Sequence, residues 1–194
     1  MKRLIATLSL LAMLTACQTS STKENPLLTE STLDYQAPDF SKIRPAHFVP
    51  AIEEGIRIQL AEIDSITSNT AAPTFENTVL AYEKSGRLLA RATSILSALV
   101  GADGTEELQK IDEETTPMLS AHHDALLLNE KLFARIKAVY DQRSSLQGED
   151  LRLTEVLYDQ FVHEGALLSA ADKEALKKIN SEIAVLQTKF TNQV

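Results

Sequence analysis

Apolar residues recur every three or four positions over most of the chain beyond residue 50, which is the spacing of one face of an α-helix. The stretch 73–100 shows this pattern most fully, and it predicts one helix that Thr74 caps and Glu76 stabilises through the helix dipole. Two neighbouring faces of this helix are apolar, and a helix apolar on two sides needs cover on both. We therefore expect it inside a bundle. The positions that form the two faces are Phe75, Val79, Tyr82, Gly86, Leu89, Thr93, Leu96 and Val100, and Leu80, Leu88, Ala92, Ile95 and Leu99.

Turn and cap residues divide the rest of the pattern into further predicted helices. One helix begins near Pro50 and ends at 68–70, and the next follows a connection at 101–104, with Asp103 as its cap. Pro117 lies inside that second helix and should kink it or divide it in two. The remaining predicted breaks are Asn129, the polar turn 144–148 and Gly165, which should end a helix over 151–163.

The last predicted helix is the most regular. Ser169 can cap it with Asp172 at the third position, and its apolar residues step by three and four like the seam of a coiled coil. Such a seam needs a partner helix of comparable length. Because the chain stops at Val194, shortly after the last seam residue, we expect that it is a truncated part of a longer polypeptide; the alternative is a frayed natural terminus. The seam consists of Leu176, Ile179, Ile183, Leu186 and Phe190.

Composition supports an all-α fold, a bundle of antiparallel helices. The chain is 44% apolar, only 5% aromatic, and contains 6 Gly and 6 Pro, which favours helices over a β-sandwich or barrel. Its formal charge is −8, and its only short basic runs are Lys2-Arg3 and Lys177-Lys178. A nucleic-acid partner is therefore not expected, since phosphate binding requires a basic patch.

Residues 1–17 have the pattern of a secretory signal. Lys2 and Arg3 precede the apolar run 4–14, which is too short to span a bilayer as a permanent helix. The sequence Leu-Thr-Ala-Cys that ends at Cys17 resembles the lipobox of bacterial lipoproteins, in which the cysteine is lipidated and becomes the new N-terminus. The alternative is a plain signal peptide with a chance cysteine nearby. By the same resemblance, Gln18 suggests an outer-membrane destination facing the periplasm.

Beyond the lipobox, the composition predicts two regions. Residues 18–38 are polar and rich in Ser and Thr, which predicts a flexible tether. Residues 39–194 carry the helical pattern and form the predicted folded part.

No constellation of residues in this chain predicts catalysis. His163-Glu164 begins like the zinc motif H-E-x-x-H, but Leu167 replaces the second histidine and Gly165 would break the helix. In the run 122–124 (His-His-Asp), adjacent helical residues point about 100° apart and cannot bind one ion together, so a surface or packing role is expected. The pairs 53–54 and 113–114 (both Glu-Glu) indicate solvated faces. We therefore predict no catalytic, cofactor-binding or metal-binding residue, and only Cys17 as a modification site.

Several stretches, taken in order, resemble the N-terminal region of the thimet oligopeptidase family of zinc metallopeptidases, and most closely its peptidyl-dipeptidase (dipeptidyl carboxypeptidase) branch. The resemblance covers nearly all of 39–194. It rests on IRPAHF at 43–48 with PAIEEGI at 50–56, PTFENT at 73–78 with SGRL at 85–88, NEKLFARI at 129–136, and FVHEGALL at 161–168.

The resemblance implies a function for a longer parent protein. Members of the family are mostly helical and hold zinc at the floor of a deep channel between two lobes, through an H-E-x-x-H motif and a later Glu. The peptidyl-dipeptidase branch removes C-terminal dipeptides from short peptides. This stretch would form part of the channel wall and be inactive alone, because no zinc-binding or catalytic residue of the family falls on it. The alternative is a complete small envelope lipoprotein that acts as a non-catalytic binding or adaptor module.

Overall fold

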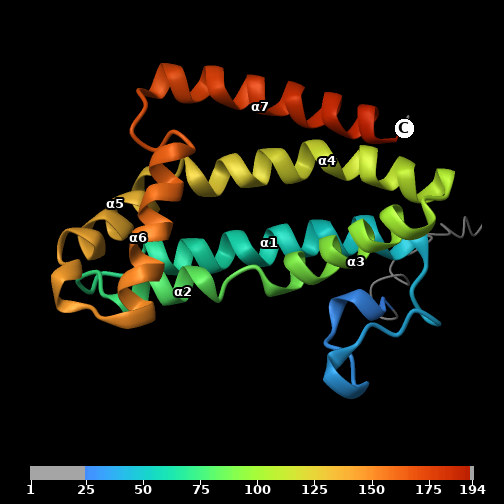
Figure 1. Cartoon of the computed structure of the whole chain (residues 1–194), viewed down its shortest axis with the longest axis horizontal. Helices are drawn as coiled ribbons and strands as arrows, with labels where there is room; N and C mark the ends of the chain where they lie inside the picture. Colours follow the sequence, from blue (N-terminus) through green and yellow to red (C-terminus); the bar gives the residue numbers. More distant parts are fainter. Residues whose placement is uncertain (1–24, 193–194) are drawn as a thin grey trace, which may run out of the picture.

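The computed structural model describes residues 25–192, and within that range the protein is built from helices and contains no β-strand (Figure 1). The signal segment with Cys17, residues 18–24 and the end at Val194 lie outside the described residues. The long helices are α1 (Phe48–Thr67), α3 (Arg87–Asp103), α4 (Glu106–Leu127), α5 (Glu130–Asp141), α6 (Gly148–His163) and α7 (Ala170–Thr191). Shorter elements are η1 (Pro26–Leu28), η2 (Asp34–Gln36), η3 (Pro45–His47), the π-helical turn η4 (Phe75–Val79), α2 (Leu80–Glu83) and η5 (Arg143–Ser145).

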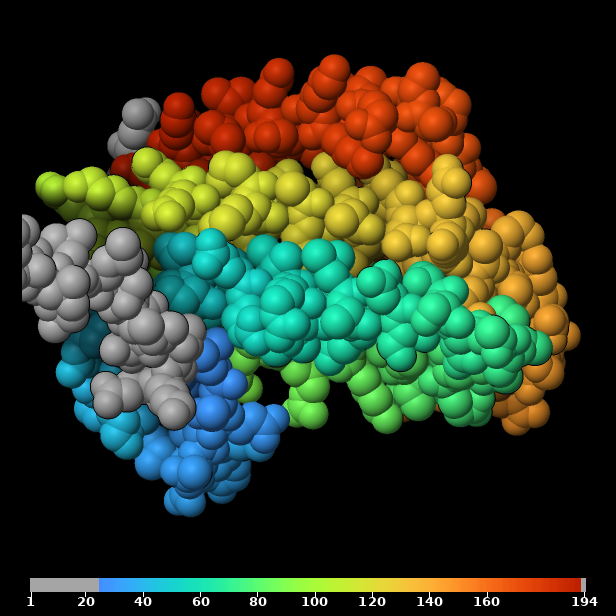
Figure 2. Space-filling model, turned by 180° about the vertical axis from the view of Figure 1, so that it is seen from behind, coloured from blue at the N-terminus to red at the C-terminus, as the bar shows by residue number. Residues whose placement is uncertain are grey.

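The helices stack in antiparallel layers, as the composition and periodicity predict. α1 packs against α3 and α4, and α7 lies on the opposite side of α4 (Figure 1). α5 and α6 pack together at one end of the stack, where they also contact η4. The segment around η1 and η2 projects from the other end as a separate small lobe below the helices (Figure 2).

The apolar core has two parts at the two ends of α1. The first joins α1 and the η4–α2 segment to α5 and α6, and its centre includes Phe161 and Leu132, both fully buried. The second joins the start of α1 to α3, the first half of α4 and η1, with Phe48 and Ile52 fully buried. Between them Gly55 brings α1 against α3, where an added Cβ would lie 2.8 Å from the Leu89 Cα atom.

The expected single helix over 73–100 is wrong. Thr74 does cap its start, since Thr74 Oγ1 accepts the Asn77 N–H at 3.2 Å. The chain then leaves the helix after α2, and Gly86 adopts φ 71°, a left-handed conformation that favours glycine, before α3 begins. The Gly86 N–H is held by Glu62 Oε2 of α1 at 2.8 Å. The apolar spacing continues through the break, which is why periodicity alone did not reveal it.

The expected connection at 101–104 is also wrong. α3 continues to Asp103, and Gly104 ends it. The cap of α4 is Thr105 rather than Asp103, because Thr105 Oγ1 accepts the Leu108 N–H at 3.3 Å. α4 then passes through Pro117 as one undivided helix, and the hydroxyls of Thr115 and Thr116 donate to carbonyls of its preceding turn.

Part of the expected flexible tether packs on the helices. Leu27 is 1% exposed, and its carbonyl accepts from Arg91 Nη2 of α3 at 2.9 Å. Asn25 caps η1 and also donates from Nδ2 to the His47 carbonyl at 2.8 Å. The packed structure therefore begins by residue 25 rather than at residue 39, and Leu27 supplies cover for the second apolar face of α3.

Three further predicted helix ends are confirmed, whereas α6 begins at Gly148, the last residue of the predicted turn 144–148 and three residues before the expected start. Asn129 caps α5 by accepting the Leu132 N–H, and Gly165 follows α6 with φ 99°. Ser169 caps α7 by accepting the Asp172 N–H at 3.2 Å.

Candidate functional site

The motifs that begin like metal sites do not assemble one in the described part of the chain. His163 ends α6 and Glu164 follows it, with Gly165 turning the chain away. Among residues 25–192 no three His, Cys, Asp or Glu side chains come close enough to hold a metal ion. These residues therefore do not fit a zinc ion, and we derive no catalytic step from them. No helix in the same range is both long and apolar enough to cross a bilayer.

The His-His-Asp run at 122–124 serves packing. His122 and Asp124 are buried at 6% and 5% exposure, while His123 between them is exposed. His122 faces α1, where its Nε2 atom lies 2.7 Å from Gln59 Oε1. Asp124 faces α7 and accepts from Asn180 Nδ2 at 2.7 Å. The run thus joins α4 to a helix on each side.

His122 belongs to a polar network that fastens the break between α2 and α3. Gln59 donates from Nε2 to Ser85 Oγ at 3.2 Å, and Ser85 Oγ donates to the Tyr82 carbonyl at 2.7 Å. Because the amide nitrogen of Gln59 is directed to Ser85, its oxygen faces His122, and this assigns the ring proton to His122 Nε2. The other ring nitrogen, Nδ1, is buried without a hydrogen-bond partner among the described residues.

Stability is expected to depend on the protonation of His122. Burial, and to a smaller extent the neighbouring His123, lowers the pKa of His122 below its ordinary value of 6.5. The unfolded chain therefore binds the proton first, and the free energy of unfolding should decrease as the pH falls below 6.5 toward the folded-state pKa. Urea unfolding at about pH 7.5 and about pH 5.5 measures this difference. It should shrink in His122→Asn and persist in the exposed control His123→Asn; an equal difference in all three proteins would contradict the assignment.

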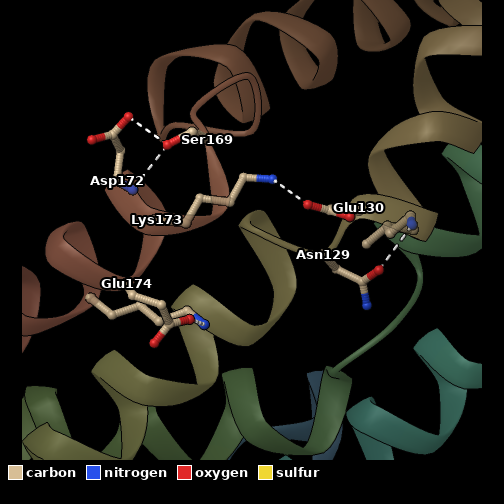
Figure 3. Close-up of polar contacts among 8 residues, drawn as sticks. Asn129, Glu130, Ser169, Asp172, Lys173 and Glu174 are labelled. Atoms are coloured by element: carbon tan, nitrogen blue, oxygen red, sulfur yellow. Dashed lines mark hydrogen bonds and ion pairs between the residues drawn. The ribbon is translucent and has the colours of Figure 1, made fainter.

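α7 begins with a polar attachment to α5 (Figure 3). Ser169 caps the helix, and the buried Lys173 extends from its first turn toward α5. Lys173 Nζ lies 3.3 Å from Glu130 Oε1, whose side chain is 75% exposed. The stem of Lys173 thus packs between the helices while its charge reaches a carboxylate at the surface.

α7 is joined to α4 by three side-chain hydrogen bonds spread along its length. Asn180 donates to Asp124, and further along Thr188 Oγ1 lies 3.0 Å from Thr116 Oγ1. Near the end, Asn192 Nδ2 donates to an oxygen of Glu113 at 3.2 Å. Small and polar residues of α7 therefore face α4.

Four of the five predicted seam residues of α7 are exposed, whereas Leu176 is half-buried and lies against Gly165. The exposed fractions are 53% for Ile179, 45% for Ile183, 66% for Leu186 and 71% for Phe190. At about 100° per residue, this seam lies about a third of a turn from Asn180 and Thr188, which contact α4. α4 has the length predicted for a partner of the seam, 22 residues as in α7, but it uses a different face of α7. We call Ile179, Ile183, Leu186 and Phe190 the α7 seam.

Comparison with known proteins gives one match for the N-terminal segment and several for most of the chain. Residues 1–18 match the prokaryotic membrane lipoprotein lipid attachment site, which agrees with lipidation at Cys17. The dipeptidyl carboxypeptidase of Salmonella typhimurium is 45% identical over 172 residues, which are 88% of this chain and 25% of the relative. The Escherichia coli dipeptidyl carboxypeptidase is 43% identical over 175 residues, 89% of this chain and 26% of the relative. Oligopeptidase A of Salmonella typhimurium is 24% identical over 88% of this chain and 25% of its own length.

These matches confirm the resemblance that the sequence motifs indicate, and the chain spans about a quarter of the length of the curated relatives. The matched residues include nearly all of this chain, so the similarity is not confined to one short motif. The chain is therefore a homologue of the dipeptidyl carboxypeptidases over about a quarter of their length, and more distantly of oligopeptidase A.

Proposed function

We propose that this chain is the N-terminal part of a lipid-anchored zinc peptidase that removes C-terminal dipeptides from short peptides. The observation that carries the proposal is the identity of 43–45% to two dipeptidyl carboxypeptidases over almost the whole chain. Since no metal cluster occurs among residues 25–192, zinc and the catalytic groups would belong to the remainder of the peptidase. The chain alone should be inactive.

The α7 seam gives this proposal a structural basis. Apolar residues at coiled-coil spacing contribute stability when another helix covers them. The relatives contain about three times as much further sequence as they share with this chain, which is enough to supply a helix of the required length. We propose that helical sequence from that remainder packs on the α7 seam, and that the stack of α1, α3 and α4 behind it supports one wall of the substrate channel.

The proposed location is the outer membrane, with the folded part facing the periplasm. The lipid attachment site at residues 1–18 supports a lipid-anchored envelope protein. Gln18 after the lipidated cysteine supports the outer membrane by its resemblance to sorted lipoproteins. There the peptidase would act on short peptides present in the envelope.

A chimera tests the peptidase proposal. In it, the described residues of this chain replace the matching quarter of the Escherichia coli dipeptidyl carboxypeptidase. We expect the folded chimera to release C-terminal dipeptides from a short synthetic peptide, as detected by mass spectrometry, and to lose activity with a zinc chelator. The isolated chain should release none.

Two results would count against the proposal. Zinc-dependent dipeptide release by the isolated chain would show that it carries a site of its own. A chimera that has native helix content and unfolds cooperatively, yet stays inactive, would favour the alternative of a non-catalytic binding or adaptor module.

A further inference from the structure

The lobe that projects beside the helices exposes three large apolar side chains within eight residues. The exposed fractions are 49% for Leu33, 103% for Tyr35 and 54% for Phe40. Leu33 immediately precedes η2, Tyr35 lies within it, and Phe40 opens the turn that follows. Leu33 also lines the rim of a hollow that includes Arg91 and Ile95 of α3, whereas Tyr35 and Phe40 do not line it. The base of the lobe is attached to the helices through Asn25, which donates to the His47 carbonyl, and Leu27, whose carbonyl accepts from Arg91.

Tyr35 is unusual in its backbone as well as in its exposure. It has φ 58°, and Gln36 has φ 57°, so two consecutive non-glycine residues occupy the left-handed region. This conformation costs about 1–2 kcal/mol per residue. The Tyr35 ring makes no aromatic pair and no side-chain hydrogen bond among the described residues that would offset the cost. The turn therefore directs an aromatic ring outward, away from the protein.

The lipid attachment site lies close to this lobe along the chain. Seven residues separate Cys17 from Asn25, and this segment can span at most about 29 Å even when fully extended. That reach is shorter than α7, whose 22 residues extend about 33 Å. A lipid on Cys17 thus holds the lobe near the membrane surface, whatever path the segment takes.

We propose that Leu33, Tyr35 and Phe40 insert into the headgroup region of the membrane that holds the lipid on Cys17, and that this second contact orients the helices relative to the membrane. Aromatic rings with a polar tip favour the membrane interface, as Tyr35 would. The proposal rests on lipidation at Cys17 and is independent of the peptidase activity. The proposed partner of these three side chains is a lipid surface. Binding to another protein is the alternative, and the quenching experiment distinguishes the two.

The charges of the lobe set the depth and the lipid preference of the contact. Glu30 lies 3.8 Å from Arg87, and Asp39 lies 2.9 Å from Lys42, so both acidic groups have a cationic neighbour. Asp34, beside Tyr35, has no ion pair among the described residues. One hydrated carboxylate at the tip permits shallow insertion at the headgroups. It also opposes binding to anionic lipid, so a larger share of phosphatidylglycerol should weaken the contact.

Tryptophan reporters test the proposal in the lipidated full chain, which has no native Trp. Tyr35→Trp is placed in the lobe, and the control Val156→Trp is placed on α6 at the other end of the molecule, where Val156 is 43% exposed (Figure 1). Both proteins are reconstituted into phosphatidylethanolamine vesicles with a minor share of phosphatidylglycerol and with lipid brominated near the headgroups. The Tyr35→Trp emission should shift to shorter wavelength and lose about half of its intensity, while Val156→Trp keeps its intensity.

Two further comparisons complete the test. Adding Leu33→Ser and Phe40→Ser to Tyr35→Trp should remove most of the quenching; both positions are exposed, so the helix content measured by circular dichroism should not change. Lipidation is checked by labelling with a radioactive fatty acid, which Cys17→Ala should abolish. A labelled Tyr35→Trp protein that is quenched no more than Val156→Trp would overturn the proposal and assign the patch to a protein partner. That result would leave the chimera experiment unaffected.

Discussion

Replacing Phe161 with alanine is expected to lower the free energy of unfolding by about 3–5 kcal/mol. The Phe161 ring is fully buried between Tyr82, at an edge-on centroid distance of 5.6 Å, and Phe133, stacked at 6.1 Å. It joins α6 to α2 and α5, so the cavity left by its removal lies where three helices meet and cannot close by the movement of one. Urea unfolding of the purified chain, followed by circular dichroism, measures the change.

Phe190→Ala provides the matched control for this experiment. Phe190 is 71% exposed, so the same truncation should change the free energy of unfolding by less than about 0.5 kcal/mol in the isolated chain. Equal losses in the two variants would contradict the structure, because they would place Phe190 in a core that this chain forms alone.

Leu186→Glu is expected to leave the isolated chain nearly unchanged and to inactivate the chimera. In the isolated chain Leu186 is 66% exposed, so the substitution should change stability by less than about 0.5 kcal/mol. In the chimera the proposed packing covers the α7 seam, and burying an unpaired carboxylate there should reduce dipeptide release at least about tenfold. Unfolding of the isolated chain and initial rates of the chimera measure the two effects.

Ser181→Glu is the control for the α7 seam. It adds the same charge at an exposed position that lies about 140° around α7 from Leu186, at the edge of the groove between α7 and α4. It should leave both the stability of the isolated chain and the activity of the chimera nearly unchanged. If Leu186→Glu and Ser181→Glu leave the chimera equally active, the α7 seam is not the surface on which the rest of the peptidase packs.

Local sequence signals predicted most of the element ends that depend on a cap or a stop; the exception is α4, which Thr105 caps instead of Asp103. Thr74, Asn129 and Ser169 each precede a helix and accept an N–H from its first turn, and Gly165 follows α6 in a left-handed conformation. These functions depend on a few neighbouring residues, so they can be inferred from the sequence alone. The lipid attachment site is a local signal of the same kind.

Features decided by contacts between distant residues were missed. The helix break at Gly86 depends on Glu62, 24 positions earlier, which holds its N–H. The packed start of the chain depends on Leu27, an apolar residue in a polar stretch, meeting α3 through Arg91. Apolar spacing cannot reveal either contact.

The packing of α7 was likewise beyond what apolar spacing can predict. The spacing correctly identified an apolar face of the helix, but it could not show that α4 would pack on a different face. Asn180 and Thr188 resemble solvent-facing residues in the sequence, and only the fold pairs them with Asp124 and Thr116.

The polar attachment of α7 also has a consequence for local unfolding. A helix held through a few hydrogen bonds, with most of its large apolar side chains in solvent, can separate from its neighbours without opening the two apolar clusters. Backbone amides of α7 should therefore exchange with deuterium through local opening, whereas those around Phe161 and Ile52 exchange only when the whole domain unfolds. Any partner that covers the α7 seam would slow exchange in this helix, so the helix that carries the contact surface would become ordered together with its partner.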